Sequence, residues 1–463
     1  LYSEAQEIRV IPQPQEISVG LDTYILSAKT SISPTGAGSE STALYLQEKI
    51  RARYGLDVKI MNPTKASNAN SVHFIHNPKL PEEGYELMVS KSGITIAADK
   101  PAGWFYGVQS LMQLWPDSLA PGSLEIALPA LDIKDAPRFS WRAFMLDEGR
   151  YFKGKEQVKM LLDEMAYLKM NIFHWHLTDD QGWRIEIKKY PRLTEIGSKR
   201  KSTQIGPLKW QSPVQSAEPH EGYYTQKDIK EIVAYAQERH IQIIPEIEMP
   251  GHSSAAIAAY PWLGTRKEAN EVPIKFGVGT DVYDVSDPQV LTFLTDVLDE
   301  VMQLFPGNVI HIGGDEVKYD HWKSSPQVQR YMQQNNLASP ADLQIFFTNG
   351  ISEYIASKGK RMMGWNEIMG HNLHEYQEES DTQANQKLAQ SSIIHFWKGD
   401  LALATLAAKN GYEIVNSLHS STYLDYDYKT IPLAAAYAFD PIPEDLDPEY
   451  HSKILGSGCQ MWG

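Results

Sequence analysis

Eight apolar runs, each ending in polar or aromatic residues, constrain the fold of this chain more than any other feature of the sequence. They follow one another from Phe139 onward and are separated by segments with apolar residues at helical spacing, such as Val290, Leu294 and Val297. This alternation is typical of parallel strands joined by helical crossovers. The runs are AFMLDEG, IFHWHLTD, IQIIPEIEM, VIHIGGDE, RMMGWNE, IIHFWKG, EIVNSLHS and GCQMWG.

Eight βα units are the number that closes a TIM barrel. An open, doubly wound sheet has the same periodicity, but nearly every run here ends in carboxylates, His or Trp, as expected where the catalytic face of a barrel is built from strand ends. We therefore predict an α/β fold with a TIM (β/α)8 barrel over residues 137–463. The eighth strand is the last element before Gly463, so we expect the natural polypeptide to continue with the missing helix.

The segment before the barrel has a different pattern. Residues 1–136 mix short alternating runs, among them SVHFIHN and YELMVSKSGITIAAD, with two helical patterns around STALYLQEKIRARYG and WFYGVQSLMQLW. Alternation of this kind indicates half-buried strands. The sequence predicts a smaller α+β N-terminal domain with an antiparallel sheet.

Charge and composition exclude several classes of function. The net charge of -15 argues against a nucleic-acid partner, and the chain has no run of about 18 apolar residues that would span a membrane. The lone Cys459 cannot form an internal disulfide. Because the His and carboxylate residues show no metal-binding spacing such as H-E-x-x-H, and Gly-rich phosphate loops are absent, we expect no metal and no cofactor.

The stretch VIHIGGDEVKYDHW poses the main chemical question of the sequence. It places Asp315 and Glu316 side by side after a buried strand, where repulsion should raise the pKa of one of them. Gly313 and Gly314 precede the pair and let another group approach the backbone closely. The alternative is an acidic pair that caps the following helix.

Several long motifs resemble glycoside hydrolase family 20, the β-N-acetylhexosaminidases. They are PRFSWRAFMLDEGRYF, HWHLTDDQGWRIEI, IIPEIEMPGH and HIGGDEV, in this order, and the resemblance covers the chain almost end to end. It implies a retaining exo-hydrolase that removes terminal β-linked GlcNAc or GalNAc, with the substrate's own 2-acetamido oxygen as nucleophile. The partner it implies is an oligosaccharide or glycoconjugate that ends in N-acetylhexosamine, and the oligomeric state stays unknown.

Adjacent carboxylates fit this mechanism better than a two-carboxylate one. An acid and a nucleophile from the enzyme would have to flank the bond at about 5 to 5.5 Å, whereas consecutive residues do not straddle a sugar. By resemblance, Glu316 is the general acid, kept protonated by burial and its charged neighbour, and Asp315 stays ionised to hold the acetamido N–H. Tyr423 would polarise the acetamido carbonyl and orient it for attack.

Three further residues match family positions around the acid. Asp179 and His252 match a pair that tunes the proton of the acid, with Asp179 fixing the imidazole tautomer. Arg142 matches an arginine that binds sugar hydroxyls, because a guanidinium fork suits vicinal hydroxyl groups. The alternatives are a structural His and an Arg that pairs with Asp147. Glu246 would be a supporting residue.

Aromatic residues at the strand ends resemble the walls of a sugar pocket. Trp365, Trp397 and Trp462 would stack on the apolar face of the sugar and pack around the acetamido methyl, although core filling is the usual role of Trp. Asp425 and Glu367 are further candidate sugar-binding residues, Asp425 for the outer hydroxyls.

The sequence departs from the family pattern in three places. Glu248 stands where the family has Asp, the motif DEGRYF alters the context near Arg142, and the chain ends before a glutamate that binds a sugar hydroxyl in the family. Other functions stay open: a relative that releases lacto-N-biose or prefers sulfated or chitin-derived ends, or a carbohydrate-binding protein without catalysis. The segment 198–222 would shape the aglycone side. A chain that begins at Leu1 suggests processing, and we expect export to the periplasm or the cell exterior.

Overall fold

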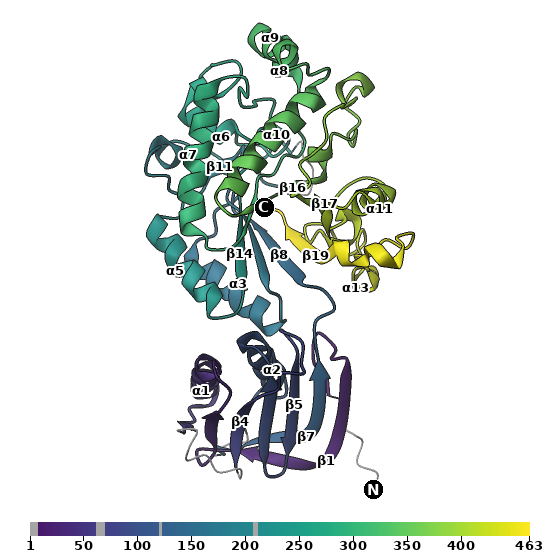
Figure 1. Cartoon of the computed structure of the whole chain (residues 1–463). Coiled ribbons are helices and arrows are strands. Elements are labelled where there is room, and N and C mark those ends of the chain that lie inside the picture. The colour runs from purple at the N-terminus through teal and green to yellow at the C-terminus, as the bar shows by residue number, and fades with distance from the viewer. Residues whose placement is uncertain (1–7, 62–69, 120–122, 207–211) are drawn as a thin grey trace. The chain divides into compact units, whose positions relative to one another are not determined.

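The computed structural model describes residues 8–61, 70–119, 123–206 and 212–463 (Figure 1). The chain divides into two compact units. One comprises residues 1–138, 161–171 and 237–241, and the other comprises residues 139–160, 172–236 and 242–463. In the part of the chain that the structure describes, no helix combines the length and apolar character needed to cross a bilayer.

The first unit contains a seven-stranded mixed sheet in the order β1-β7-β5-β6-β4-β2-β3. Strands β1, β7, β5 and β6 are antiparallel, as predicted, but β6, β4, β2 and β3 run parallel. The parallel part arises because helix α1 forms the crossover after β2, which brings the chain back in the same direction. The strands are β1 (Glu16–Leu26), β2 (Ser31–Pro34), β3 (Lys59–Ile60), β4 (Ser71–His76), β5 (Tyr85–Ser90), β6 (Gly93–Ala98) and β7 (Ile126–Asp135). Helices α1 (Glu40–Tyr54) and α2 (Pro101–Gln113) pack on the sheet and on each other.

The second unit confirms the predicted TIM barrel. Eight strands close in the order β14-β15-β16-β17-β18-β19-β8-β9, and each of the eight predicted runs supplies one of them. All neighbouring strands pair in parallel. The strands are β8 (Trp141–Asp147), β9 (Ile172–His176), β14 (Gln242–Glu246), β15 (Val309–His311), β16 (Arg361–Trp365), β17 (Ile393–Phe396), β18 (Glu413–Asn416) and β19 (Ile454–Met461).

Helices outside the strands make most of the crossovers (Figure 1). The long ones begin at strong start signals: Asp287 and Ser339 cap α7 and α10 by accepting backbone N–H groups, and a proline follows each cap. The crossover helices are α3 (Lys155–Tyr167), α5 (Gln226–Gln237), α7 (Pro288–Leu304), α10 (Pro340–Ser357) and α11 (Leu401–Lys409). Between β16 and β17 the chain instead makes two 3-10 turns, η3 (Asn366–Met369) and η4 (Glu379–Asp381).

Shorter helices and strands lie in the loops of the barrel. They are β10 (Thr178–Asp179), β11 (Gly182–Trp183), α4 (Arg192–Glu195), β12 (Lys199–Arg200), β13 (His220–Glu221), α6 (Ser254–Ala259), η2 (Pro261–Leu263), α8 (Asp320–Ser324), α9 (Pro326–Gln334), α12 (His419–Thr422), α13 (Leu433–Ala438) and η5 (Pro448–Lys453).

Apolar side chains from the strands fill the interior of the barrel. This cluster consists of Trp141, Ala143, Ile172, Ile244, Val309, Met363, Ile393 and Val415. Such layers of inward side chains make the interior of a TIM barrel a packed core, which leaves the carboxyl ends of the strands as the place for a site.

Candidate active site

Strand register brings charged residues from four neighbouring strands to one level at the carboxyl edge of the barrel. Asp147 of β8 pairs with His176 of β9, His176 pairs with Glu246 of β14, and Glu246 pairs with His311 of β15. Because all strands run parallel, these ends lie on the same face, where TIM barrels carry their chemistry. The side chains described below gather around this edge.

Asp315 and Glu316 follow β15 on a sharply turned backbone. Gly313, Gly314 and Glu316 all have positive φ, of 67°, 88° and 52°. A Cβ on Gly313 would lie 1.8 Å from Oε2 of Glu248, so this glycine makes room for a buried carboxyl group. The close approach expected from the two glycines is therefore made, on this side, by the protein's own Glu248.

His252 lies between the acidic pair and a second pair of carboxylates. Its Nε2 is 3.6 Å from Oδ2 of Asp315 and 3.7 Å from Oε2 of Glu316. Its Nδ1 is 3.1 Å from Oδ1 of Asp179 and 3.2 Å from Oδ2 of Asp180. Burial lowers the pKa of His252, but these carboxylates outweigh it and hold that pKa well above the usual range. The imidazole therefore carries a proton next to Glu316.

Asp179 is the centre of the charged network behind His252. Arg150 Nη1 lies 2.8 Å from Oδ2 of Asp179, and Nε2 of His176 lies 2.7 Å from the same oxygen. Although burial favours a neutral carboxyl, the charges of Arg150 and His252 keep the pKa of Asp179 well below its usual range. This fixed negative charge is what retains the proton on His252.

The pKa values of the adjacent carboxyl groups differ in the opposite sense from the prediction. Burial, and to a lesser extent the negative charges of Glu367 and Glu246, raises the pKa of Asp315 to about 7, although His252 acts to lower it. Burial also raises the pKa of Glu316, but the neighbouring imidazolium of His252 outweighs it, and the pKa is lowered. The prediction that burial keeps Glu316 protonated is therefore wrong for the sugar-free protein, in which His252 carries the proton.

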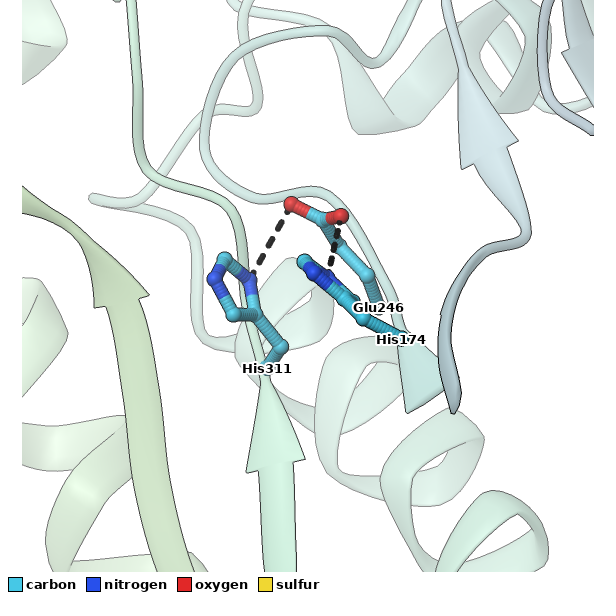
Figure 2. Close-up of side chains that lie close together, drawn as sticks. All are labelled: His174, Glu246 and His311. Carbon is cyan, nitrogen blue, oxygen red and sulfur yellow. Dashed lines mark ion pairs between the residues drawn. The ribbon is translucent and has the colours of Figure 1, made fainter. Parts of the chain in front are cut away.

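Glu246 binds several donors under the site. Figure 2 shows its carboxylate between two imidazoles: Nε2 of His174 lies 2.8 Å from Oε2, and Nδ1 of His311 lies 3.0 Å from Oε1. These three residues have the ligand types of a metal site. However, Trp365 Nε1 donates to Oε1 at 2.7 Å, and His176 Nδ1 lies 2.6 Å from Oε2.

Both carboxylate oxygens of Glu246 thus already contact N–H groups. Nδ1 of His311, besides its contact with Glu246, lies 3.0 Å from the backbone N of Gly313. Burial would raise the pKa of Glu246, but the histidines His311, His176 and His174 lower it far below the usual range. The cluster fits a charged hydrogen-bond centre that anchors Trp365 better than it fits a metal site.

Four aromatic side chains form a box beside the acidic pair. Tyr423 stacks on Trp397 at a centroid distance of 6.0 Å and an interplanar angle of 9°, and Trp462 lies 5.9 Å from Tyr423. Trp365 lies 6.4 Å from Trp397 and 6.0 Å from Trp462. Trp365 is only 1% exposed, so it is the floor of the box and the other rings are its walls. The structure brings all four predicted aromatic residues together.

Arg142 lies away from this group. It is the second residue of β8, at the amino end of the strand, and its Nη1 donates to the carbonyl of Phe139 at 2.8 Å. Asp147 ends the same strand, about 17 Å away at roughly 3.3 Å per residue. A sugar held at the carboxyl edge is out of reach of Arg142, and the assignment of this residue to sugar binding is corrected.

Arg150 is the arginine that the structure places in the site. It lies three residues after β8, its guanidinium is 5.0 Å from the ring centroid of Trp462, and its Nε donates to Gln181 at 3.2 Å. It was present in the motif DEGRYF, and its position just after a strand end was the signal that could have identified it.

Glu367 lies in the site next to the predicted Trp397 and to a histidine that sequence reasoning missed. It accepts the indole N–H of Trp397 at 2.9 Å, and Nε2 of His374 lies 3.0 Å from it. Lys398 in turn contacts Nδ1 of His374 at 3.1 Å. His374 lies in the β16–β17 connection, which has no hydrophobic period, and no pattern in the sequence marked it.

Several buried polar atoms around the box have no hydrogen-bond partner within the protein. Buried groups of this kind are costly to leave unpaired, and those beside the aromatic box are available to bind a polar ligand. The unpaired atoms belong to His252 (Nε2), Asp315 (Oδ1), Asp425 (Oδ1), Trp462 (Nε1) and both oxygens of Glu248.

The segment 198–222, which was expected to shape the aglycone side, contains the paired strands β12 and β13. Residues 207–211 of this segment lie outside the described residues.

Comparison with known proteins gives the chain a family context. The profile described as "Glycosyl hydrolase family 20, catalytic domain" matches residues 139–463, and "Glycosyl hydrolase family 20, domain 2" matches residues 7–136. A β-hexosaminidase of Porphyromonas gingivalis is 36% identical over 98% of this chain and 57% of its own length. A β-hexosaminidase of Vibrio furnissii is 34% identical over 99% of this chain and 73% of its own. The chain thus spans little more than half of the first of these relatives.

Solved structures are similar over nearly the whole chain. An exo-β-N-acetylglucosaminidase of Vibrio harveyi, in complex with N-acetylglucosamine, has a TM-score of 0.82 and 30% identity over 98% of this chain and 69% of its own. A chitobiase of Flavobacterium johnsoniae has a TM-score of 0.80 and 33% identity over 98% of this chain and 65% of its own.

Proposed function

The chain belongs to glycoside hydrolase family 20, and from this membership we propose that it is an exo-acting, retaining β-N-acetylhexosaminidase. It would remove terminal β-linked GlcNAc or GalNAc from an oligosaccharide or glycoconjugate. The observation that carries the proposal is the set of unpaired buried atoms around an aromatic box, next to Asp315 and Glu316. Such a site suits a sugar with an apolar face, hydroxyl groups and an amide.

In the first step, the acetamido oxygen of the substrate attacks C1 while the bond from C1 to the leaving oxygen breaks. In its ionised form, Asp315 accepts the amide N–H through its unpaired Oδ1 and stabilises the positive charge of the oxazolinium ion that forms. Tyr423 orients the amide carbonyl by a hydrogen bond. Burial keeps the pKa of the Tyr423 hydroxyl well above 10, so it is a donor throughout.

Glu316 gives a proton to the leaving oxygen, and His252 is the source of that proton. The imidazolium Nε2 is 3.7 Å from Oε2 of Glu316, and a bound aglycone would exclude water and favour the neutral carboxyl. His252 and Glu316 therefore share one proton. In the second step a water molecule attacks C1, Glu316 takes its proton, the bond from C1 to the amide oxygen breaks, and the β configuration is retained.

Arg150 takes the sugar-binding role that the resemblance had given to Arg142. Its guanidinium is buried between Asp179 and the ring of Trp462, where its remaining N–H groups can donate to vicinal hydroxyls. The unpaired Oδ1 of Asp425 and Nε1 of Trp462 supply an acceptor and a donor for further groups of the sugar. The box of Trp365, Trp397 and Trp462 would hold the ring and the acetamido methyl.

The test compares initial rates of the full-length protein on an aryl N-acetyl-β-glucosaminide and on the matching aryl β-glucoside. We expect release from the acetamido sugar alone. In the Glu316→Gln variant, kcat/KM should fall about 100- to 10,000-fold, the usual contribution of a general acid. The loss should be smaller with a leaving group that needs no proton.

Two outcomes would reject the proposal. Similar rates on both sugars would mean that the acetamido group is not the nucleophile, which removes the roles of Asp315 and Tyr423. Release from neither sugar, combined with tight binding of N-acetylglucosamine, would favour a carbohydrate-binding protein or an enzyme that requires a larger substrate.

A further inference from the structure

The connection between β16 and β17 places a second histidine against the proposed acid. This connection lacks the usual crossover helix, and within it His374 is buried to 95%. Nδ1 of His374 lies 3.8 Å from Oε1 of Glu316, almost the distance at which His252 faces the other oxygen of the same carboxyl. Each carboxyl oxygen of Glu316 therefore faces its own imidazole.

Hydrogen bonds fix the ring of His374 on both sides. Lys398 Nζ lies 3.1 Å from Nδ1, and because an ammonium only donates, Nδ1 is an acceptor. Nε2 then carries the proton and donates it to Glu367 at 3.0 Å. The ring of Tyr376 stacks on the imidazole at 5.0 Å and 13°. The result is a neutral imidazole that keeps an ammonium group on the nitrogen facing Glu316.

The chain of contacts continues into the sugar pocket. Glu367, which accepts from His374, also accepts the indole N–H of Trp397, a wall of the aromatic box. Lys398 follows Trp397 directly, and its Nζ lies 5.4 Å from the centroid of that ring. A sugar that contacts Trp397 would therefore be linked, through Glu367 and His374, to the side chain of the acid.

Charged or titratable groups face Glu316 from each neighbouring element. His252 lies after β14, Arg150 lies after β8, His374 lies between β16 and β17, and Asp315 precedes Glu316 on the loop after β15. Lys318 lies two residues further along that loop and interacts with Glu316 by charge. Of these groups, His374 is the one that contacts both Glu367, a partner of Trp397, and the ammonium group of Lys398.

We propose that His374 is a positioning residue for the general acid: its Nδ1 faces the carboxyl oxygen of Glu316 that His252 does not face, and the same nitrogen holds the Lys398 ammonium. This inference rests on the proposed function, because it presupposes that Glu316 is the acid. A cation close to a carboxyl favours its ionised form, so the Lys398 ammonium that His374 holds lowers the pH at which the shared proton of Glu316 and His252 is lost. The two residues would thereby set the upper pH limit of the reaction.

The experiment measures kcat/KM of the full-length protein against pH with an aryl N-acetyl-β-glucosaminide. In His374→Gln the ammonium loses its acceptor, and we expect the basic limb of the profile to move up by about one pH unit. Lys398→Met removes the charge itself and keeps the histidine, so it should move the limb in the same direction. Because both changes break the same contact between His374 and Lys398, the double variant should shift the basic limb no further than either single variant does.

A matched control is available in the same connection. His371→Gln makes the same substitution at a half-buried histidine with no recorded contact to Glu316, and its pH profile should equal that of the wild type. A loss of activity in His374→Gln that is equal at all pH values would overturn the proposal, because a purely structural role predicts this result. An additive shift in the double variant, or a limb that moves down, would overturn it as well.

Failure of this inference can be told apart from failure of the proposed function. In one outcome, the wild type is active only on the acetamido sugar while the basic limb of the pH profile stays the same in the variants. This result rejects the role of His374 and leaves Glu316 as the acid. A wild-type protein without any turnover rejects both.

Discussion

The two halves of the barrel's carboxyl edge differ in kind. The half built from β8, β9 and β14 carries ionised side chains in close contact, such as the 2.8 Å pair of Arg150 with Asp179. The half built from β16 to β19 carries rings, of which Tyr423 and Trp397 stack in parallel. One half can hold and move a proton, and the other can hold an apolar sugar face. The acidic pair after β15 lies at the boundary, where both are needed.

This difference separates two kinds of substitution. A change in the charged half should alter kcat and the pH profile, whereas a change in the aromatic half should mainly raise KM. Two residues of the aromatic half are exceptions: Tyr423, which orients the amide in the proposed mechanism, and His374, which contacts the acid. The predictions below test how far the separation holds.

Among the changes that compare the two halves, the largest effect is expected for Asp179→Asn, which removes a charge that holds the proton on His252. We expect kcat/KM to fall about 100-fold, within the range for proton-transfer groups. Because the pKa of His252 depends on this carboxylate, the shared proton should be lost at lower pH, and the basic limb should move down. The measurement is the pH profile of kcat/KM.

Asp296→Asn serves as the control for this change. Asp296 pairs with Lys189 and Tyr190 on the outer surface of the barrel, so its variant should keep the wild-type profile. A large loss in Asp179→Asn without movement of the limb would mean that Asp179 only supports the fold.

A smaller effect is expected for Trp462→Phe in the aromatic half. The phenyl ring is smaller and lacks the indole N–H, which is one of the unpaired buried donors. We expect KM to rise about tenfold, equivalent to about 1.4 kcal/mol, with kcat and the basic limb little changed. A shift of the limb in this variant would show that the two halves are not separate, and steady-state kinetics at several pH values decide the matter.

The smallest effect concerns stability and Glu248. Burial, together with Asp315 and Glu246, raises the pKa of this carboxyl well above 4.5. A raised folded pKa contributes stability that is present at low pH and lost as the pH rises above the unfolded value, by up to about 1.4 kcal/mol per pH unit. Glu248→Gln should therefore be more stable than the wild type at pH 7, with a smaller difference at pH 4.5.

Thermal unfolding at the two pH values measures this effect. The same substitution at the exposed Glu353 should leave the pH dependence of Tm unchanged. Parallel Tm curves for Glu248→Gln and the wild type would contradict the prediction.

Most of the fold could be predicted because each barrel strand is a compact apolar run with its own turn signals. The parts that could not be predicted are those in which contacts between distant segments, and not the local sequence pattern, determine the structure. Alternating runs identify a strand but not its direction, so the parallel pairing of β4 with β6 was not visible. The β16–β17 connection lacks a helix although its neighbours have one, and its polar sequence carried no signal for what replaces it.

The candidate site could be located from the strand-end motifs, but its internal arrangement could not be deduced from them. One choice could have been made: Arg142 lies near the start of β8 and Arg150 follows its end, so chain order alone places Arg150 at the carboxyl edge. The order of pKa values in Asp315 and Glu316 depends on His252, which is distant in sequence. His374 reaches the site through a loop, and loop conformations have no periodic signature.

The pairing of β19 with β8 has a consequence for how quickly the site can form. The backbone N–H of Gly463 donates to Asp147, a contact that joins residues 316 positions apart. Contacts of such long sequence separation require the closure of a long loop and are slow to form. Trp462 and Arg150 meet across this seam. The sugar pocket should therefore be among the last parts of the molecule to form during folding, and a refolding chain should regain helical content before it binds N-acetylglucosamine.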